Sequence, residues 1–403
     1  MPARYIKLPL GCGGKPARTV GDKNRMTTTS IFSDHAARLR QFMARSLAAP
    51  EPSATVLNET FSQLALEWFA LQFQHNAAYQ AWCKSLEASP ETVAHWADIP
   101  ALPTSAFKEL DVTSISLAER TQVFHSSGTT EQRPSRHFQH AESLALYEVS
   151  LLSWFRACLL AEVKEKVHFL ILTPPPSSAP HSSLVHMFET VRRELGTAQS
   201  KFHGAMDASG AWSLDEAGLQ AALRSAMDAA QPVMLLGTAF SYVHLVDQLA
   251  LEGKVFNLPS GSRALETGGY KGRSRSLPKS ELHQLIGERL GLAAEQIVCE
   301  YGMSELSSQA YDVGPVGAES SSQQARRFQF PPWARVSIVS PETGREVQDG
   351  ETGLVRVIDL ANLWSVAAVQ TEDLAIRRGD GFELLGRAVT AEARGCSLMS
   401  ANR

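Results

Sequence analysis

The sequence predicts an α/β protein whose main sheet is largely parallel and carries helices on both faces. Strand-like and helical runs alternate over about 180 residues after position 121, which is the pattern of consecutive βαβ units. A helical segment precedes this region, and short strand-like runs separated by turns follow it. A chain of 403 residues is long enough to bury a large core.

The segment 33–86 is predicted to form helices that lead into the sheet. Pro50 and Pro52 separate two of them, because proline lacks the backbone N–H that a helix interior needs. In the second helix, five apolar residues recur at spacings that place them on one face: Phe61, Leu64, Ala65, Trp68 and Phe69.

The alternating region comes next. Its strand-like runs are 121–125, 167–173, 232–236, 263–266 and 296–300. Its helical runs are 144–161, 183–195, 214–229, 242–251 and 279–290. Beyond Gly302 the strand-like segments become shorter and are bounded by turns, so we expect antiparallel strands or a small barrel-like subdomain at 333–339, 353–360 and 382–385.

Net charge and cysteine usage exclude several classes of protein. Lys and Arg total 38 against 42 Asp and Glu, a net charge of −4, so the electrostatic footprint of a dedicated nucleic-acid binder is missing. No apolar run reaches the roughly 18 residues of a membrane span. The five cysteines are odd in number and far apart, which excludes a disulfide framework of neighbouring positions and favours a reducing cytoplasm.

A loop rich in serine and threonine is the clearest chemical signal. It follows a predicted strand and contains Ser126, Ser127, Gly128, Thr129 and Thr130. Hydroxyls and backbone N–H groups around a glycine that can adopt positive φ converge on anions, so the loop is a candidate phosphate site. A turn without a ligand is the alternative, since these residue types are common in turns.

The cysteines and histidines do not predict a zinc site. His125, His137 and His140 flank the loop without forming a convincing ligand set. Three cysteines lie in helical or strand-like apolar runs and are predicted to be core residues: Cys83, Cys158 and Cys299.

Three further motifs follow the loop in order, at 300–305, 371–374 and 380–387. With the loop, they resemble the signature motifs of the adenylate-forming ligases, the superfamily of acyl-CoA synthetases and luciferases. The resemblance implies the large N-terminal domain of these enzymes, an α/β fold with a terminal β-subdomain. Only 403 − 387 = 16 residues follow the last motif, so we expect the mobile C-terminal cap domain of about a hundred residues to be absent.

The resemblance also assigns roles to single residues. It implies that 126–130 bind the phosphates of ATP, that Ser304 contacts the α-phosphate and that Glu305 helps to bind Mg²⁺. These residue types suit attack by a carboxylate on a phosphate, which needs hydrogen-bond donors, a cation and an acidic metal ligand. The loop departs from the superfamily pattern because its usual basic residue is missing, and Arg133 or Arg136 would have to replace it.

Four more residues are implied to adjoin the nucleotide. Tyr301 and Gly302 belong to the second motif, Asp373 would accept hydrogen bonds from the ribose hydroxyls, and Arg387 would lie near the nucleotide. Taken alone, Asp373 could equally be a turn residue, and Glu305 an acid at a helix N-terminus.

The segment 392–398 indicates one branch of this superfamily. Its sequence resembles the corresponding segment of the acyl-protein synthetases of bacterial bioluminescence operons, the LuxE type. Three other segments match the same family: 103–108, 237–240 and 266–272. In that family a cysteine near the C-terminus accepts the fatty acyl group, which implies this role for Cys396. Lys271 would contact a phosphate or the incoming carboxylate, and a surface lysine after a glycine turn is an equal alternative.

The expected function is ATP-dependent activation of a fatty acid, transfer to Cys396, and delivery to a partner reductase or acyltransferase. A phenylacetate-type ligase that uses CoA or a carrier protein, and a nonenzymatic nucleotide-binding subunit, are the alternatives. The expected organisation is a disordered tail over 1–28, an α/β acyl- and ATP-binding domain over 29–308, a β-rich subdomain over 309–387, and a flexible tail over 388–403.

Overall fold

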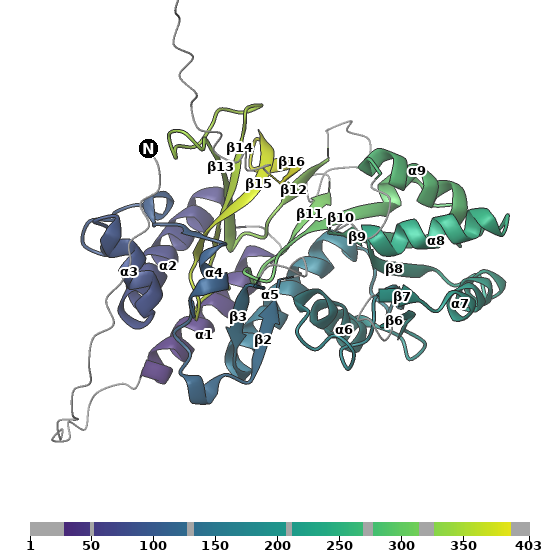
Figure 1. Ribbon diagram of the computed structural model, residues 1–403, viewed down its shortest axis with the longest axis horizontal. Coiled ribbons are helices and arrows are strands. Elements are labelled where there is room, and N and C mark those ends of the chain that lie inside the picture. Colours follow the sequence, from purple (N-terminus) through teal and green to yellow (C-terminus); the bar gives the residue numbers. More distant parts are fainter. Residues whose placement is uncertain are drawn as a thin grey trace, which may run out of the picture.

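The computed structural model describes residues 28–48, 52–126, 133–206, 212–268, 277–313 and 326–387. Helices α1, α2 and α3 lie at one end of the molecule and α7, α8 and α9 at the other, with the strands of a large sheet between them (Figure 1). None of the helices in these segments combines the length and apolarity needed to cross a bilayer.

The predicted helical lead-in consists of α1 (Thr28–Ser46), α2 (Ala54–His75) and α3 (Ala77–Ser85). Ser53 and Asn76 begin the last two helices, because each side chain accepts a hydrogen bond from a backbone N–H of the first turn. The five apolar residues predicted for one face of α2 are all buried.

Four of the five predicted strands of the alternating region form the parallel half of the sheet, together with β5. The prediction is wrong for 121–125, because this strand pairs antiparallel with β3 (Arg136–Gln139) in a separate hairpin. Strands β5, β4, β8, β9 and β10 lie side by side in that order, and all four pairs are parallel. Their bounds are Lys201–Phe202, His168–Ile171, Val233–Thr238, Arg263–Thr267 and Ile297–Tyr301. The helices between and beside them are α5 (Ala141–Leu159), α6 (Ser183–Leu195), α7 (Glu216–Asp228), α8 (Ala239–Leu251) and α9 (Lys279–Leu290).

Alternate residues of these strands pack against different helices. On β8, Met234 and Leu236 join the apolar cluster that contains α5 and α6, whereas Val233 and Leu235 join the cluster of α7, α8 and α9. Successive side chains of a strand point to opposite faces, so the sheet is covered by helices on both faces. This confirms the predicted α/β class.

The antiparallel half continues the same sheet. From β10 the order runs through β11 (Ala310–Val313), β12 (Arg327–Gln329), β16 (Gly381–Arg387), β15 (Ala368–Arg378), β14 (Thr352–Asp359) and β13 (Ala334–Val339). The strands are antiparallel, and they extend the sheet through the β10–β11 pair instead of forming a separate barrel. The expected domain boundary at 308/309 falls just before β11, the first strand of this half.

Short elements complete the described chain. Strands β2 (Gln122–His125) and β3 (Arg136–Gln139) form a separate antiparallel hairpin, and β6 (Gly204–Met206) pairs with β7 (Trp212–Leu214). Strand β1 (Leu102–Pro103) adds to β15, and α4 (Ala106–Glu109) follows it.

Helix α2 is anchored to the segment that follows β14. The Gln72 amide donates to the carbonyls of Asn362 and Leu363, both at 3.0 Å, and accepts from the backbone N–H of Ala367 at 2.9 Å. Gln72 is fully buried, so this one side chain pairs three backbone groups that would otherwise be unsatisfied. Helix α2 thereby fixes the segment 362–367, which includes Asn362, a residue of the candidate site described below.

Candidate active site

The β2–β3 hairpin carries the base of the serine- and threonine-rich loop. Ser126 follows β2 and Ser135 precedes β3; the Ser135 N–H donates to the Ser126 hydroxyl at 3.0 Å, and the Ser126 N–H donates to the Ser135 carbonyl at 3.3 Å. These bonds close the loop at its base. Four predicted phosphate-binding residues lie outside the described residues: Ser127, Gly128, Thr129 and Thr130.

The turn after β10 lies against this base. The Ser304 hydroxyl donates to one Glu305 carboxylate oxygen at 2.9 Å, and the Ser135 hydroxyl donates to the other. The two serine oxygens are 3.4 Å apart, and all three residues are buried. Ser135, at the base of the serine- and threonine-rich loop, therefore contacts the predicted metal ligand Glu305, although 170 residues separate them in the sequence.

Glu305 has the surroundings of a cation ligand. Within the described segments its carboxylate accepts hydrogen bonds from two hydroxyls and forms no ion pair with Lys, Arg or His. A buried carboxylate without a charged partner is unfavourable unless a cation neutralises it. Carboxylate and hydroxyl oxygens are hard ligands that suit Mg²⁺, so the donor set fits the metal that the sequence predicts.

His137 supports the turn as a neutral imidazole. Its Nδ1 lies 2.7 Å from the Ser304 carbonyl oxygen, which can only accept, so Nδ1 carries the proton. The Nε2 atom then accepts from the Gln139 amide at 3.3 Å. Burial lowers the pKa of His137 to about 4, and the hydrogen bond to Ser304 only partly opposes this.

A second layer of buried polar groups holds the turn from the other side. Asn362 donates to the Glu305 carbonyl at 2.7 Å and accepts from the Ser307 hydroxyl at 2.7 Å. Asp359 accepts from the Ser307 N–H at 2.8 Å and from the Ser308 hydroxyl at 2.7 Å. Burial raises the pKa of Asp359 to about 6 despite these bonds. The Glu305 backbone is thus fixed independently of any ligand.

Three predicted nucleotide residues form a neighbouring group. The Tyr301 hydroxyl donates to Asp373 at 2.9 Å, and the Arg387 guanidinium lies 3.6 Å from the other oxygen of the same carboxylate. Asp373 lies within β15 opposite Arg387 on β16, so it is a strand residue and not a turn residue. Burial raises the pKa of Asp373, while Tyr301 and Arg387 oppose the shift.

The Tyr301 ring is held by three phenylalanines. Its centroid lies 5.2 Å from Phe382, 6.1 Å from Phe328 and 6.2 Å from Phe330, each in an edge-to-face arrangement. Such pairs add about 0.5–1.5 kcal/mol each beyond area burial. The aromatic group fixes the hydroxyl that orients Asp373.

Glu300 and Gly302 flank Tyr301. The Thr267 hydroxyl donates to the buried Glu300 carboxyl, whose pKa burial raises to about 7. A side-chain carbon at Gly302 would clash with the other oxygen of Glu300, so a larger residue there would push the Glu300 side chain out of its place. Glu300 therefore occupies the space beside the motif's glycine as a group that titrates near neutral pH.

Other predicted residues are only partly placed. Lys271 and Cys396 lie outside the described residues. Of the two arginines considered for the missing basic residue, Arg136 pairs with Asp111 at 3.0 Å, and Arg133 is exposed 3.8 Å from Glu109. Glu305 lies in a turn and not at a helix start.

Four residues that shape the site have no role among the sequence predictions, although Glu300 lies within the 300–305 motif: Ser135, Glu300, Asp359 and Asn362. Glu300 and Asp359 could have been found from the sequence, because each is a charged residue at or next to the end of an apolar strand, where a buried charge is unusual. Ser135 and Asn362 carried no local signal, because their partners are distant in sequence.

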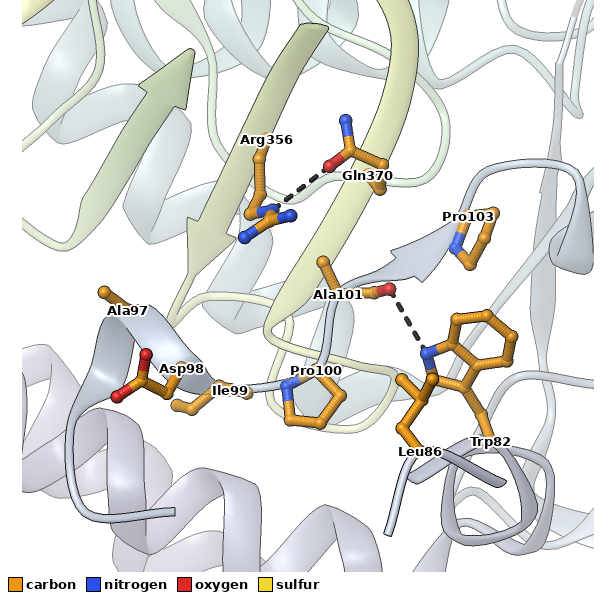
Figure 2. A pocket seen from close by; sticks show the side chains of 10 residues that line it. All are labelled: Trp82, Leu86, Ala97, Asp98, Ile99, Pro100, Ala101, Pro103, Arg356 and Gln370. Atoms are coloured by element: carbon orange, nitrogen blue, oxygen red, sulfur yellow. Dashed lines mark hydrogen bonds between the residues drawn. The ribbon is translucent and has the colours of Figure 1, made fainter. Parts of the chain in front are cut away.

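A pocket of about 450 Å³ lies elsewhere, between α3, β14 and β15 (Figure 2). Arg356 donates to Gln370 at 3.1 Å on one side, and Trp82 donates to the Ala101 carbonyl at 3.2 Å on the other. None of the residues predicted for the nucleotide site lines it.

Comparisons with known proteins agree with this geometry. A family profile described as "Acyl-protein synthetase, LuxE" matches residues 40–403. A long-chain-fatty-acid–luciferin-component ligase of Vibrio harveyi is 22% identical over 352 residues, covering 84% of this chain and 86% of the relative. The protein of the same name from Aliivibrio fischeri is 27% identical over 183 residues, covering 42% and 45%.

The fold is also shared with solved enzymes. A 2-hydroxyisobutyryl-CoA ligase, in complex with 2-HIB-AMP and CoA, superposes with a TM-score of 0.59 at 14% identity, covering 83% of this chain and 68% of that one. This confirms the fold predicted from the motifs. Because the family profile spans most of the chain, the protein belongs to the LuxE family of acyl-protein synthetases, ligases with the adenylate-forming fold.

Proposed function

We propose that the protein activates a fatty acid as an acyl-adenylate at the expense of ATP and then transfers the acyl group to its own Cys396. The observation that carries the proposal is the contact of Ser135 and Ser304 with Glu305 at the base of the serine- and threonine-rich loop. That contact brings two hydroxyl donors together with a buried carboxylate that forms no ion pair among the described residues, beside the base of a loop suited to phosphates.

In the first step, a carboxylate oxygen of the fatty acid attacks the α-phosphorus of ATP. An oxygen–phosphorus bond forms, the bond to the bridging oxygen breaks, and pyrophosphate leaves. Ser304 and the loop donate hydrogen bonds to phosphate oxygens, and Asp373 accepts them from the ribose hydroxyls. A Mg²⁺ ion held by Glu305 would supply positive charge against the two anions that must meet.

In the second step, the Cys396 thiolate attacks the acyl carbon of the adenylate. The thiol has already lost its proton to water, so a carbon–sulfur bond forms, the carbon–oxygen bond to AMP breaks, and AMP leaves. Thiolates are strong nucleophiles, and the expected flexible tail over 388–403 would let the sulfur reach the adenylate. The thioester is then available to an acyl reductase or acyltransferase.

The family and its relatives support the choice of substrate. The family description names acyl-protein synthesis, and the relatives' names specify long-chain fatty acids. The profile match extends to residue 403 and so includes Cys396. We therefore propose a fatty acid in place of a small carboxylic acid.

The test separates the two steps. Cys396→Ser should still release pyrophosphate from ATP in the presence of a fatty acid, and it should not accumulate a stable acyl-protein. Cys12→Ser is the matched control, because Cys12 lies outside the family match, and it should behave as wild type in both assays. Acyl-protein that persists in Cys396→Ser, or turnover that requires CoA and survives this change, would contradict the proposal.

A further inference from the structure

Glu266, His283 and Cys299 form a compact cluster on the α9 side of the sheet. Glu266 on β9 and Cys299 on β10 are register partners, and His283 projects from α9. The Cys299 sulfur lies 2.9 Å from Glu266 Oε2 and 3.4 Å from His283 Nε2, and these last two atoms are 3.6 Å apart. Glu266 and Cys299 are buried, and His283 is partly exposed.

The three atoms converge on one point. Glu266 and Cys299 approach the same nitrogen of His283, whereas a nucleophile–base–carboxylate relay uses the two opposite nitrogens of the ring. Tetrahedral zinc with ordinary sulfur, nitrogen and oxygen bonds separates its ligand atoms by about 3.4–3.6 Å. Two of the three distances match this spacing.

The remaining distance, from sulfur to carboxylate, is short because the thiol donates its proton to Glu266. Burial, Glu266 and Asp312 raise the pKa of the Cys299 thiol, so the sulfur keeps its proton as long as no metal ion is bound. A metal ion displaces that proton and lets sulfur and oxygen separate.

The surrounding charges tolerate a cation. Asp312 accepts from the Cys299 N–H and pairs with Lys279 and Arg326. Once a metal displaces the thiol proton, Asp312, Glu266 and the Cys299 thiolate are three negative groups beside the two positive groups Lys279 and Arg326. Lys279 is half exposed, so its side chain can move away from the cluster.

We propose that Glu266, His283 and Cys299 bind one divalent cation of the zinc class, with water in the fourth position. Thiolate, imidazole and carboxylate together favour zinc over Mg²⁺ or Ca²⁺, which prefer oxygen alone. The ion fastens α9 to the β9–β10 pair. None of the three ligands is among the residues predicted to contact the nucleotide, and Cys299 points to the opposite face of β10 from its neighbour Glu300.

Zinc binding to the full-length protein tests the proposal. After treatment with a chelator and desalting, wild type should take up about one zinc per chain by calorimetry and metal analysis. With Co²⁺ it should show a thiolate-to-cobalt charge-transfer absorption. His283→Asn and Cys299→Ser should weaken zinc binding by at least about 100-fold. Cys158→Ser, which removes a thiol on α5, should bind as wild type.

A second measurement does not depend on variants that fold. Zinc should slow the reaction of Cys299 with a thiol reagent in the wild-type protein, read out by peptide mass spectrometry, while Cys158 labelling stays unchanged. Zinc uptake at background level in wild type, equal uptake by Cys299→Ser, or unchanged Cys299 labelling would overturn the proposal. These results are independent of ATP and fatty acid, so they do not bear on the proposed function.

Discussion

Replacing Glu300 by glutamine removes a buried carboxyl whose ionisation the fold opposes. Burial raises the pKa of Glu300 from 4.5 to about 7. The difference, 7 − 4.5 = 2.5, corresponds to about 3 kcal/mol at about 1.36 kcal/mol per pKa unit. Because the folded pKa is raised, the stability that this group contributes is complete below pH 4.5 and is lost as the pH rises through 7.

Glu300→Gln cannot ionise and can still accept the hydrogen bond from Thr267. Its free energy of unfolding relative to wild type should therefore increase by about 2.5 kcal/mol between about pH 5 and about pH 8.5, measured by urea unfolding at both values. Glu288→Gln, at an exposed position of α9, should follow wild type at both pH values. A difference between Glu300→Gln and wild type that stays constant within about 0.5 kcal/mol would refute the reasoning.

Three further changes probe other parts of the site. Burial lowers the pKa of His137 from 6.5 to about 4, so the stability that neutral His137 contributes is complete above pH 6.5 and is lost as the pH falls through 4. His137→Gln should remove about 3 kcal/mol of this pH dependence of the free energy of unfolding, measured with urea. An unchanged pH profile would contradict the reasoning. Asp373→Asn should weaken AMP binding by about tenfold or more in calorimetry, and unaltered affinity would remove Asp373 from the nucleotide site. Gln72→Ala should lower the free energy of unfolding by about 2–4 kcal/mol, because the Ala367 N–H and two carbonyls lose their partner, and a loss under about 0.5 kcal/mol would show that other groups replace it.

Helices that are defined by their own hydrophobic pattern and capping residues could be predicted from the sequence. The predicted helices 183–195 and 279–290 coincide with α6 and α9. Ser182 caps the first turn of α6, and Gly291 ends α9 in the left-handed conformation that glycine adopts without strain. The βαβ alternation likewise follows from hydrophobic runs of the right length.

The features that the sequence did not predict depend on distant contacts. Strand β3 is four residues long and polar, so it shows no hydrophobic alternation, and it is defined by pairing with β2. Ser135 meets Glu305 only because this hairpin lies beside the turn after β10. In the same way, Glu266 and Cys299 are partners in the β9–β10 register, so Cys299 is buried as predicted but has polar neighbours.

The site as a whole has an asymmetric construction. The turn that carries Ser304 and Glu305 is fixed by two buried partners, Asp359 and Asn362. Preorganised groups of this kind stabilise developing charge without rearranging at the moment of reaction. We propose that the acceptor cysteine, in contrast, moves on the tail, so that one rigid site serves both the adenylation and the transfer.

Intact-protein mass spectrometry tests the central claim most directly. After incubation with ATP, Mg²⁺ and a panel of fatty acids, wild type should gain the mass of one acyl group, and neutral hydroxylamine should remove it as expected for a thioester. The same treatment should leave the mass of Cys396→Ser unchanged. No acyl adduct on wild type with any fatty acid, or an adduct that persists in Cys396→Ser, would contradict self-acylation at Cys396.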